Sequence, residues 1–83
     1  MRVRFHPHAR DRLAERGTTE EEVVLVVETG EKFMARFGRF GFRRNVPFGD
    51  LWRGKRYRMK QIEAYAIRRY DGWFVISVVT RYF

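Results

Sequence analysis

The spacing of apolar residues changes at Gly30, and this change limits the folds that the chain can adopt. Before Gly30 the apolar residues recur at helical spacing, as Ala9 and Leu13 do at four positions apart. After Gly30 they alternate with polar residues, which is the pattern of half-buried β-strands. The sequence therefore predicts an α+β fold in which helices come first and a sheet follows.

Local signals mark both ends of the first helix. Pro7 suits the first position of a helix, where an N–H group would have no partner inside the helix. Gly17 is typical of the residue that closes a helix, because glycine adopts a left-handed backbone without steric cost. We therefore expect a helix between these two residues, after a short strand at residues 3–5.

A second helix is expected to follow directly. Thr18 and Glu21 have the spacing of a capping box, and the acidic residues that follow suit the positive end of a helix. This helix contains the apolar run at residues 23–27 and stops at Gly30. Together the two helices would form a hairpin over residues 7–29 that covers one face of the sheet.

The rest of the chain predicts three or four antiparallel strands. Residues 37–48 alternate between apolar and polar side chains, as a half-buried strand does. The apolar phase shifts near Lys60 and Gln61, which indicates a bulge or a strand break. Asp71, followed by glycine, predicts a hairpin turn. Residues 73–83 are apolar on both faces, which is typical of a strand in the middle of its sheet.

The size and composition exclude several classes of protein. A chain of 83 residues holds one domain, so we expect residues 1–83 to form a single unit. The absence of cysteine excludes disulfides, cysteine-based zinc sites and thiol nucleophiles. No apolar run follows Met1, and the longest apolar run is too short to span a bilayer, so we expect a cytoplasmic protein without a membrane partner.

Positive charge is concentrated in the second part of the chain. The net charge is +8, but residues 1–31 carry five basic and seven acidic side chains, and residues 32–83 carry thirteen basic and three acidic ones. Arginine outnumbers lysine fifteen to three, which favours bidentate contacts with phosphates and stacking on bases. We therefore expect RNA as the partner, although a docking face for an acidic protein or a merely solubilising surface would have the same composition. The candidate nucleic-acid contacts are Arg39, Arg43, Arg44, Arg53, Lys55, Arg56 and Arg58, on the sheet face opposite or beside the helices.

Short motifs at both ends of the chain have a recurrent order and spacing. They are His8-Ala9, Arg12-Leu13, Glu15-Arg16-Gly17, Lys60-Gln61-Ile62-Glu63, Trp73-Phe74-Val75-Ile76 and Val79-Thr80-Arg81-Tyr82-Phe83. In this order they resemble a bacterial family of small domains that is related in fold to the RelE/ParE superfamily of toxins from toxin–antitoxin pairs. The resemblance covers nearly the whole chain. Thr18 departs from the family, which usually has Ile or Val at this position.

This resemblance implies a helical hairpin packed on a small antiparallel β-sheet, which is the RelE/ParE-like fold. RelE-like toxins cleave messenger RNA, often on the ribosome, whereas ParE-like members act on DNA gyrase. The implied partners are RNA, including ribosome-bound message, and a small acidic antitoxin protein. Many members of the family have no demonstrated activity, so the resemblance alone does not make the chain an enzyme.

Metal-free cleavage of RNA needs a base, an acid and cations that stabilise the phosphorane. His8 is the candidate proton-transfer group, because its ordinary pKa lies near neutrality. Arg12 follows His8 on the same helix face, and Arg16 and Lys60 would also hold the phosphate. Tyr82 could donate a proton or stack on a base.

Each of these residues also has a structural interpretation. His8 could hydrogen-bond the sheet, Lys60 could be structural or solvated, and Tyr82 could belong to the core. The chain has no phosphate-binding glycine loop, so we expect no nucleotide cofactor, and the pair of histidines around Pro7 lacks further nearby ligands for a metal. Two classes of function stay open: a toxin-like, metal-independent endoribonuclease, and a non-catalytic module that binds RNA or an acidic protein.

Overall fold

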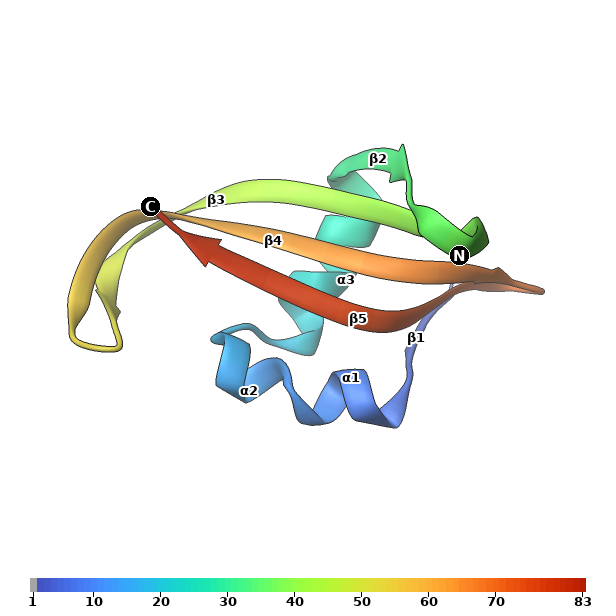
Figure 1. Cartoon of the computed structure of the whole chain (residues 1–83), viewed down its shortest axis with the longest axis horizontal. Coiled ribbons are helices and arrows are strands. Elements are labelled where there is room, and N and C mark those ends of the chain that lie inside the picture. Colours follow the sequence, from blue (N-terminus) through green and yellow to red (C-terminus); the bar gives the residue numbers. More distant parts are fainter. Residues whose placement is uncertain (1) are drawn as a thin grey trace.

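The computed structural model describes residues 2–83 as an α+β fold with short helices on one side of a curved sheet (Figure 1). The α+β class predicted from the sequence is therefore confirmed. The elements in chain order are β1 (Arg2–Phe5), α1 (Pro7–Asp11), α2 (Leu13–Arg16), α3 (Glu20–Thr29), β2 (Glu31–Met34), the 3₁₀ turn η1 (Arg36–Gly38), β3 (Phe40–Trp52), β4 (Lys55–Arg69) and β5 (Gly72–Tyr82).

The sheet has five strands in the order β1-β5-β4-β3-β2, and it is mixed rather than antiparallel. The strand β1 pairs with β5 in parallel, whereas all other neighbours are antiparallel. The expectation of a purely antiparallel sheet is wrong because the helices cross over between β1 and the rest of the sheet. The central strand is β4, not residues 73–83. The strand β5 instead lies between β1 and β4, and the helices α1 and α2 pack against it.

The predicted first helix is broken into α1 and α2 at Arg12. The Arg12 N–H donates to the carbonyl of Ala9, three residues back, and the backbone of Arg12 (φ −92°, ψ −7°) leaves the α-helical path. The expected hairpin of two continuous helices is therefore replaced by three short helices. The apolar stripe itself is confirmed, because Ala9 and Leu13 are both buried.

The junction before α3 also differs by one residue from the prediction. Gly17 closes α2 with a left-handed backbone (φ 74°), and the next N–H, that of Thr18, still bonds back to Leu13. Thr18 therefore belongs to the end of α2, and the capping box is formed by Thr19 and Glu22. In the predicted apolar run at residues 23–27, Val23, Val26 and Val27 are buried in the core.

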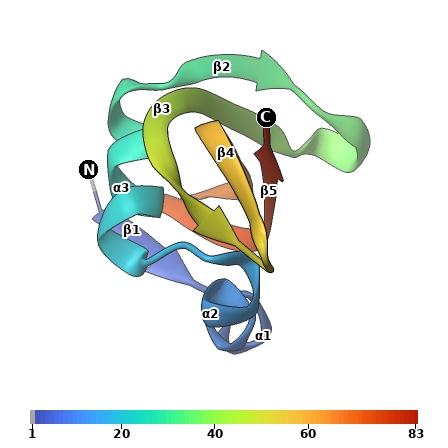
Figure 2. The same cartoon turned by 90° about the vertical axis from the view of Figure 1, so that its left-hand side faces the viewer.

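The strands β3 and β4 form a long hairpin that extends past the end of β5 and bends toward α2 (Figures 1 and 2). Its two-residue turn, Arg53 and Gly54, has positive φ at both positions, as hairpin turns often require. The bulge expected at Lys60 and Gln61 is absent there, since both pair regularly with β5. The irregularity lies just before Lys60, where two successive N–H groups, those of Arg58 and Met59, donate to the Phe83 carbonyl.

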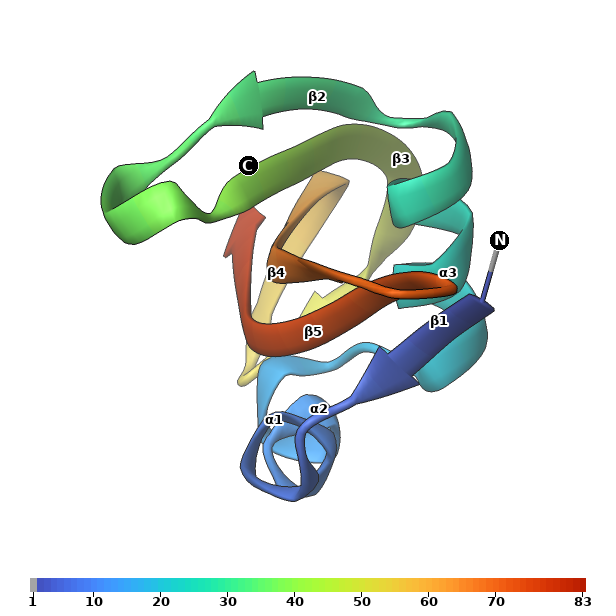
Figure 3. The same cartoon turned by 90° about the vertical axis from the view of Figure 1, so that its right-hand side faces the viewer.

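The core lies between the helices and the concave sheet (Figure 3). The side chains of Ile62, Val23, Val26 and Val75 are the largest that are fully buried, and they come from β4, α3 and β5. The Trp73 ring meets the rings of Phe40 and Phe42 edge-on, at centroid distances of 5.2 and 5.0 Å. The core thus fixes α3 across the middle of the sheet and leaves α1 and α2 along β5.

Gly17 should tolerate a methyl group poorly. An added Cβ would lie 2.3 Å from the Tyr82 hydroxyl and 2.6 Å from the Trp52 ring, and the backbone is left-handed. Overpacking and the left-handed strain together predict that Gly17→Ala lowers the free energy of unfolding by about 3 kcal/mol. Gly54→Ala is the control, because its backbone is also left-handed but nothing lies within 4 Å, so it should cost about 1 kcal/mol. If urea unfolding showed the same loss of free energy for both variants, the close packing around Gly17 would be contradicted.

Candidate functional site

The helices α1 and α2 run along the part of β5 that β1 leaves unpaired. The strand β1 pairs only with Gly72–Val75, and beyond it the Arg16 Nε donates to the Val78 carbonyl at 3.0 Å. The β5 strand bulges at Ile76, because Val75 faces Ala66 but Ser77 already faces the preceding residue of β4. A groove of about 160 Å³ lies at this edge, lined by His8, Ala9, Arg12, Arg16, Ile76, Ser77 and Val78.

This first groove brings together three of the five residues predicted to be catalytic. His8 and Arg12 are exposed and Arg16 is half-buried, so their polar groups face solvent at the groove. The helical spacing from His8 to Arg12 survives the break in the helix. The structure therefore places one imidazole and two guanidinium groups around a single small cavity.

A second groove of about 140 Å³ adjoins the first at Arg16, which lines both. Its other lining residues are Glu15, Trp52, Arg53, Val79, Thr80 and Tyr82. Arg53 lies 5.1 Å over the Trp52 ring and donates to the Glu15 carbonyl at 2.9 Å, so the hairpin turn is attached to the end of α2. Three cations, those of Arg12, Arg16 and Arg53, thus border these two adjoining grooves, which we call the trough.

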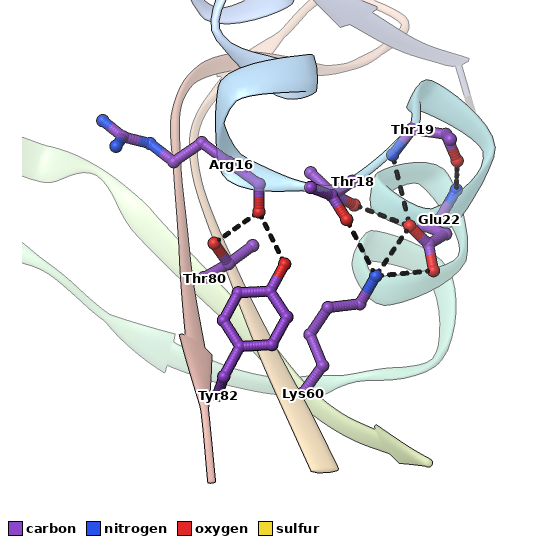
Figure 4. A network of polar contacts seen from close by, with 8 residues as sticks. Arg16, Thr18, Thr19, Glu22, Lys60, Thr80 and Tyr82 are labelled. Carbon is purple, nitrogen blue, oxygen red and sulfur yellow. Dashed lines mark hydrogen bonds and ion pairs between the residues drawn. The ribbon is translucent and has the colours of Figure 1, made fainter. Parts of the chain in front are cut away.

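Tyr82 positions Arg16 and does not face the first groove. Its hydroxyl donates to the Arg16 carbonyl at 2.8 Å, and Thr80 donates to the same oxygen at 2.7 Å (Figure 4). The Tyr82 ring stacks on Trp52, with centroids 4.9 Å apart and an interplanar angle of 18°. Burial raises the pKa of Tyr82 above its ordinary value of 10.0. Its proton is therefore held in a structural hydrogen bond.

Lys60 is also structural in its contacts. It is 5% exposed, and its ammonium donates to both carboxylate oxygens of Glu22 at 3.1 Å and to the Gly17 carbonyl at 3.0 Å (Figure 4). Glu22 also accepts from the Thr18 hydroxyl and the Thr19 N–H. Every proton of the ammonium has a partner, so the structure does not bring Lys60 to the groove of His8 and Arg12.

The sheet face opposite the helices is neutralised by a row of ion pairs across the strands. Arg43 contacts Glu31 at 3.0 Å and Glu63 at 3.4 Å, and Arg81 also contacts Glu63. Glu63 is only 5% exposed, so it holds both arginines close to the sheet. Arg43, one of the predicted contacts, is therefore neutralised on this face, because the register of β3 with β2 and β4 places Glu31 and Glu63 opposite it.

The other predicted nucleic-acid contacts are spread over three regions. Arg44 points to the helical side and donates to the Thr29 hydroxyl. Arg39 lies beside η1, over the Phe37 ring at 5.7 Å. The remaining four stand on the hairpin and are exposed: Arg53, Lys55, Arg56 and Arg58.

Cations without a carboxylate partner gather at the edges of the sheet. Six of the 18 Lys and Arg side chains take part in ion pairs within residues 2–83, which leaves twelve without one. Six of these twelve border the trough or stand on the hairpin beside it: Arg12, Arg16, Arg53, Lys55, Arg56 and Arg58. The free positive charge is thus greatest around the trough.

His6 is a second imidazole at this end of the molecule, and it was not among the residues predicted to be catalytic. Its Nδ1 accepts from the His8 N–H at 3.0 Å and caps α1. The two imidazole centroids are 6.4 Å apart, with an interplanar angle of 74°. The residue just before Pro7 is a helix N-cap position, and this signal would have identified the role of His6.

Comparison of the chain with protein-family models, with curated proteins and with solved structures finds no match. Within residues 2–83 no three His, Asp or Glu side chains are placed to hold a metal ion together. Among the helices described, none has the length and apolar character needed to cross a membrane.

The ion pair between Lys60 and Glu22 should contribute to stability. Lys60→Met leaves the Glu22 carboxylate, which is 38% exposed, and the Gly17 carbonyl without their donor, which should lower the free energy of unfolding by about 2 kcal/mol. Arg10→Met is the matched control: its pair with Glu20 is exposed on both sides and should contribute less than about 1 kcal/mol. If urea unfolding showed equal effects, Lys60 would not be a structural residue.

Tyr82 should make the fold sensitive to alkali. Because burial raises the pKa of Tyr82 in the folded state, the unfolded chain loses the phenol proton first, near pH 10. Stability from this group is complete below pH 10 and falls as the pH rises above it. Urea unfolding between about pH 8 and pH 11 should therefore show a steeper alkaline loss for the wild type than for Tyr82→Phe. If the free energy of unfolding fell equally with pH in both proteins, the Tyr82 phenol would not be the cause of the alkaline loss.

Proposed function

We propose that the chain is a toxin-like RNA-binding protein that holds the sugar-phosphate backbone in the trough along β5. The observation that carries this proposal is the shared position of Arg16 in two adjoining grooves, which are also bordered by Arg12 and Arg53. None of these three guanidinium groups has a carboxylate partner among the described ion pairs. Successive arginines along a narrow trough suit successive phosphates of one strand.

The exposed cations of the hairpin extend this surface. Lys55, Arg56 and Arg58 stand on β4 next to the turn that Arg53 attaches to α2. Their charges raise the local concentration of a polyanion and accelerate its encounter with the trough. Single-stranded RNA suits the grooves better than a duplex, because the grooves are small.

A second candidate function, metal-independent cleavage of the bound RNA, is favoured by the two imidazoles. Transfer within the RNA needs one group to take the 2′-hydroxyl proton while its oxygen attacks the phosphorus, and another to protonate the departing 5′-oxygen. His8 lines the first groove and His6 lies beside it, so the pair could perform both transfers. Arg12 and Arg16 would neutralise the phosphorane, and the product would be a 2′,3′-cyclic phosphate.

Binding of a small acidic antitoxin belongs to the same proposal. A protein that carries a row of carboxylates would meet the same arginines as the RNA backbone. Such a partner would therefore compete with RNA for the trough.

RNA binding can be tested by fluorescence anisotropy with a labelled single-stranded oligoribonucleotide. Arg12→Ala and Arg53→Ala should each weaken binding and lower the log–log salt slope by about 0.7, the value for one phosphate contact on a single strand. Arg2→Ala is the control, because Arg2 is exposed and pairs with Asp71 at the far end of the sheet. Binding that does not depend on salt, or that Arg2→Ala weakens as much, would contradict the proposal.

Cleavage is tested separately, on free RNA and on ribosome-bound message. His8→Gln should lower the rate at least about a hundredfold while RNA affinity stays nearly constant, because a positioned acid or base contributes 10²–10⁴-fold. His6→Asn should have a comparable effect and keep the helix cap, since asparagine is a good N-cap residue. Chelators should change nothing. A wild type that cuts neither substrate would end the enzyme hypothesis and leave RNA binding intact.

A further inference from the structure

A further groove lies away from the trough, where η1 joins β2 to β3. It has a volume of about 400 Å³ and is lined by Phe33, Ala35, Arg36, Phe37, Arg39 and Tyr65. Three of these side chains are aromatic rings, two are guanidinium groups and none is acidic. We call this the η1 groove. The core does not account for it, because Phe37 is 85% exposed.

Gly41 creates the floor of the η1 groove. In the sheet register it lies between Phe33 on β2 and Tyr65 on β4. A Cβ at this position would be 2.2 Å from the Phe33 ring, so only glycine lets that ring lie across β3. The Phe33 ring then meets the Tyr65 ring edge-on, with centroids 6.1 Å apart and an interplanar angle of 87°. The floor is therefore a rigid pair of rings.

Phe37 forms the exposed wall. Its backbone is left-handed (φ 60°, ψ 38°), a conformation that an aromatic residue rarely adopts, and the following Gly38 is left-handed too. This turn holds the Phe37 ring in solvent, where no contact with the core offsets the strain of the left-handed backbone. The Arg39 guanidinium lies 5.7 Å over the same ring, and Arg36 also lines the groove. A strained, exposed ring between two free cations is an arrangement suited to a ligand.

We propose that the η1 groove binds an unpaired nucleobase of the RNA, which stacks on Phe37 while Arg36 and Arg39 contact the neighbouring phosphates. This inference rests on the proposed RNA-binding function and assigns a second contact to it. Flat rings interleaved with arginines recognise single-stranded bases without a sequence preference. An acidic peptide would find the same charges, but Ala35 is the only aliphatic side chain available to its apolar residues. The observations therefore favour a base.

The η1 groove and the trough lie at opposite edges of the sheet. The turn η1 follows the edge strand β2, whereas α1 and α2 lie along β5, with β3 and β4 in between (Figure 3). The two contacts therefore use different chemistry at separate places: the trough holds backbone phosphates, and the η1 groove holds a base. A ligand that lacks bases should lose only the second contact.

The experiment compares two 2′-O-methyl oligomers of equal length, one oligoadenylate and one without bases, since the methyl group prevents cleavage. The wild type should bind oligoadenylate more tightly, by about fivefold to a hundredfold, which is the range for stacking one base on an aromatic ring. Phe37→Gly should abolish this preference. Glycine adopts the left-handed backbone without strain, so the variant should melt no lower than the wild type. Met34→Ala, at a neighbouring residue that is 77% exposed but does not line the groove, is the control and should keep the preference.

The outcomes separate the two proposals. If the wild type binds both oligomers equally, or if Phe37→Gly keeps the preference, the η1 groove is not a base site and the trough proposal stands. If the wild type binds neither oligomer, the RNA-binding function fails, and the inference fails with it. Displacement of oligoadenylate from the wild type, but not from Phe37→Gly, by an acidic peptide with one phenylalanine would instead assign the groove to a protein partner.

Discussion

The contact of Lys60 with Glu22 and with the Gly17 carbonyl is the constraint on which the candidate site depends. It joins the middle of the sheet to the point where α2 ends and α3 begins. A buried ammonium needs all three of its protons bonded, and only one arrangement of this junction supplies the acceptors. An apolar residue at position 60 would leave the Glu22 carboxylate and the Gly17 carbonyl without this donor. The buried pair thus fixes the register of the helices on the sheet, a role for which such pairs are suited even where they add little net stability.

Arg16, at the end of α2, connects this junction to the two grooves along β5. Its carbonyl accepts from Thr80 and Tyr82, and its Nε donates to Val78, so both its backbone and the base of its guanidinium are fixed to β5. Only the two terminal nitrogens stay available to a ligand. A guanidinium held in this way loses little conformational entropy when it binds a phosphate. The structure therefore makes Arg16 a rigid point between two grooves, whereas the exposed cations of the hairpin stay adaptable.

The sequence predicted features that depend on local spacing and missed those that depend on pairing register. The spacing of Ala9 and Leu13 correctly predicted the apolar stripe of the helices. The change of spacing at Gly30 correctly predicted where the sheet continues after them. Lys60 was misplaced because the phase shift lies at Arg58 and Met59, just before it, and a shift of one residue turns a side chain to the other face of a sheet. The neutralisation of Arg43 by Glu63 could not be predicted, since these residues are twenty positions apart and meet only through the register of β3 with β4.

The placement of the carboxylates explains how so basic a chain folds and still keeps a charged surface. Glu63 lies under Arg43 and Arg81 at the centre of the open sheet face, where unpaired like charges would repel one another most strongly. The helical carboxylate of Glu22 neutralises the one buried lysine. The cations that remain free lie at the two edges of the sheet and along the hairpin, where water screens them and the folded state loses little by their repulsion. In the proposed function, a polyanion would therefore bind at the rim of this sheet and not on its face. A flexible single strand can bend around the rim, whereas a stiff duplex would have to lie flat on the sheet.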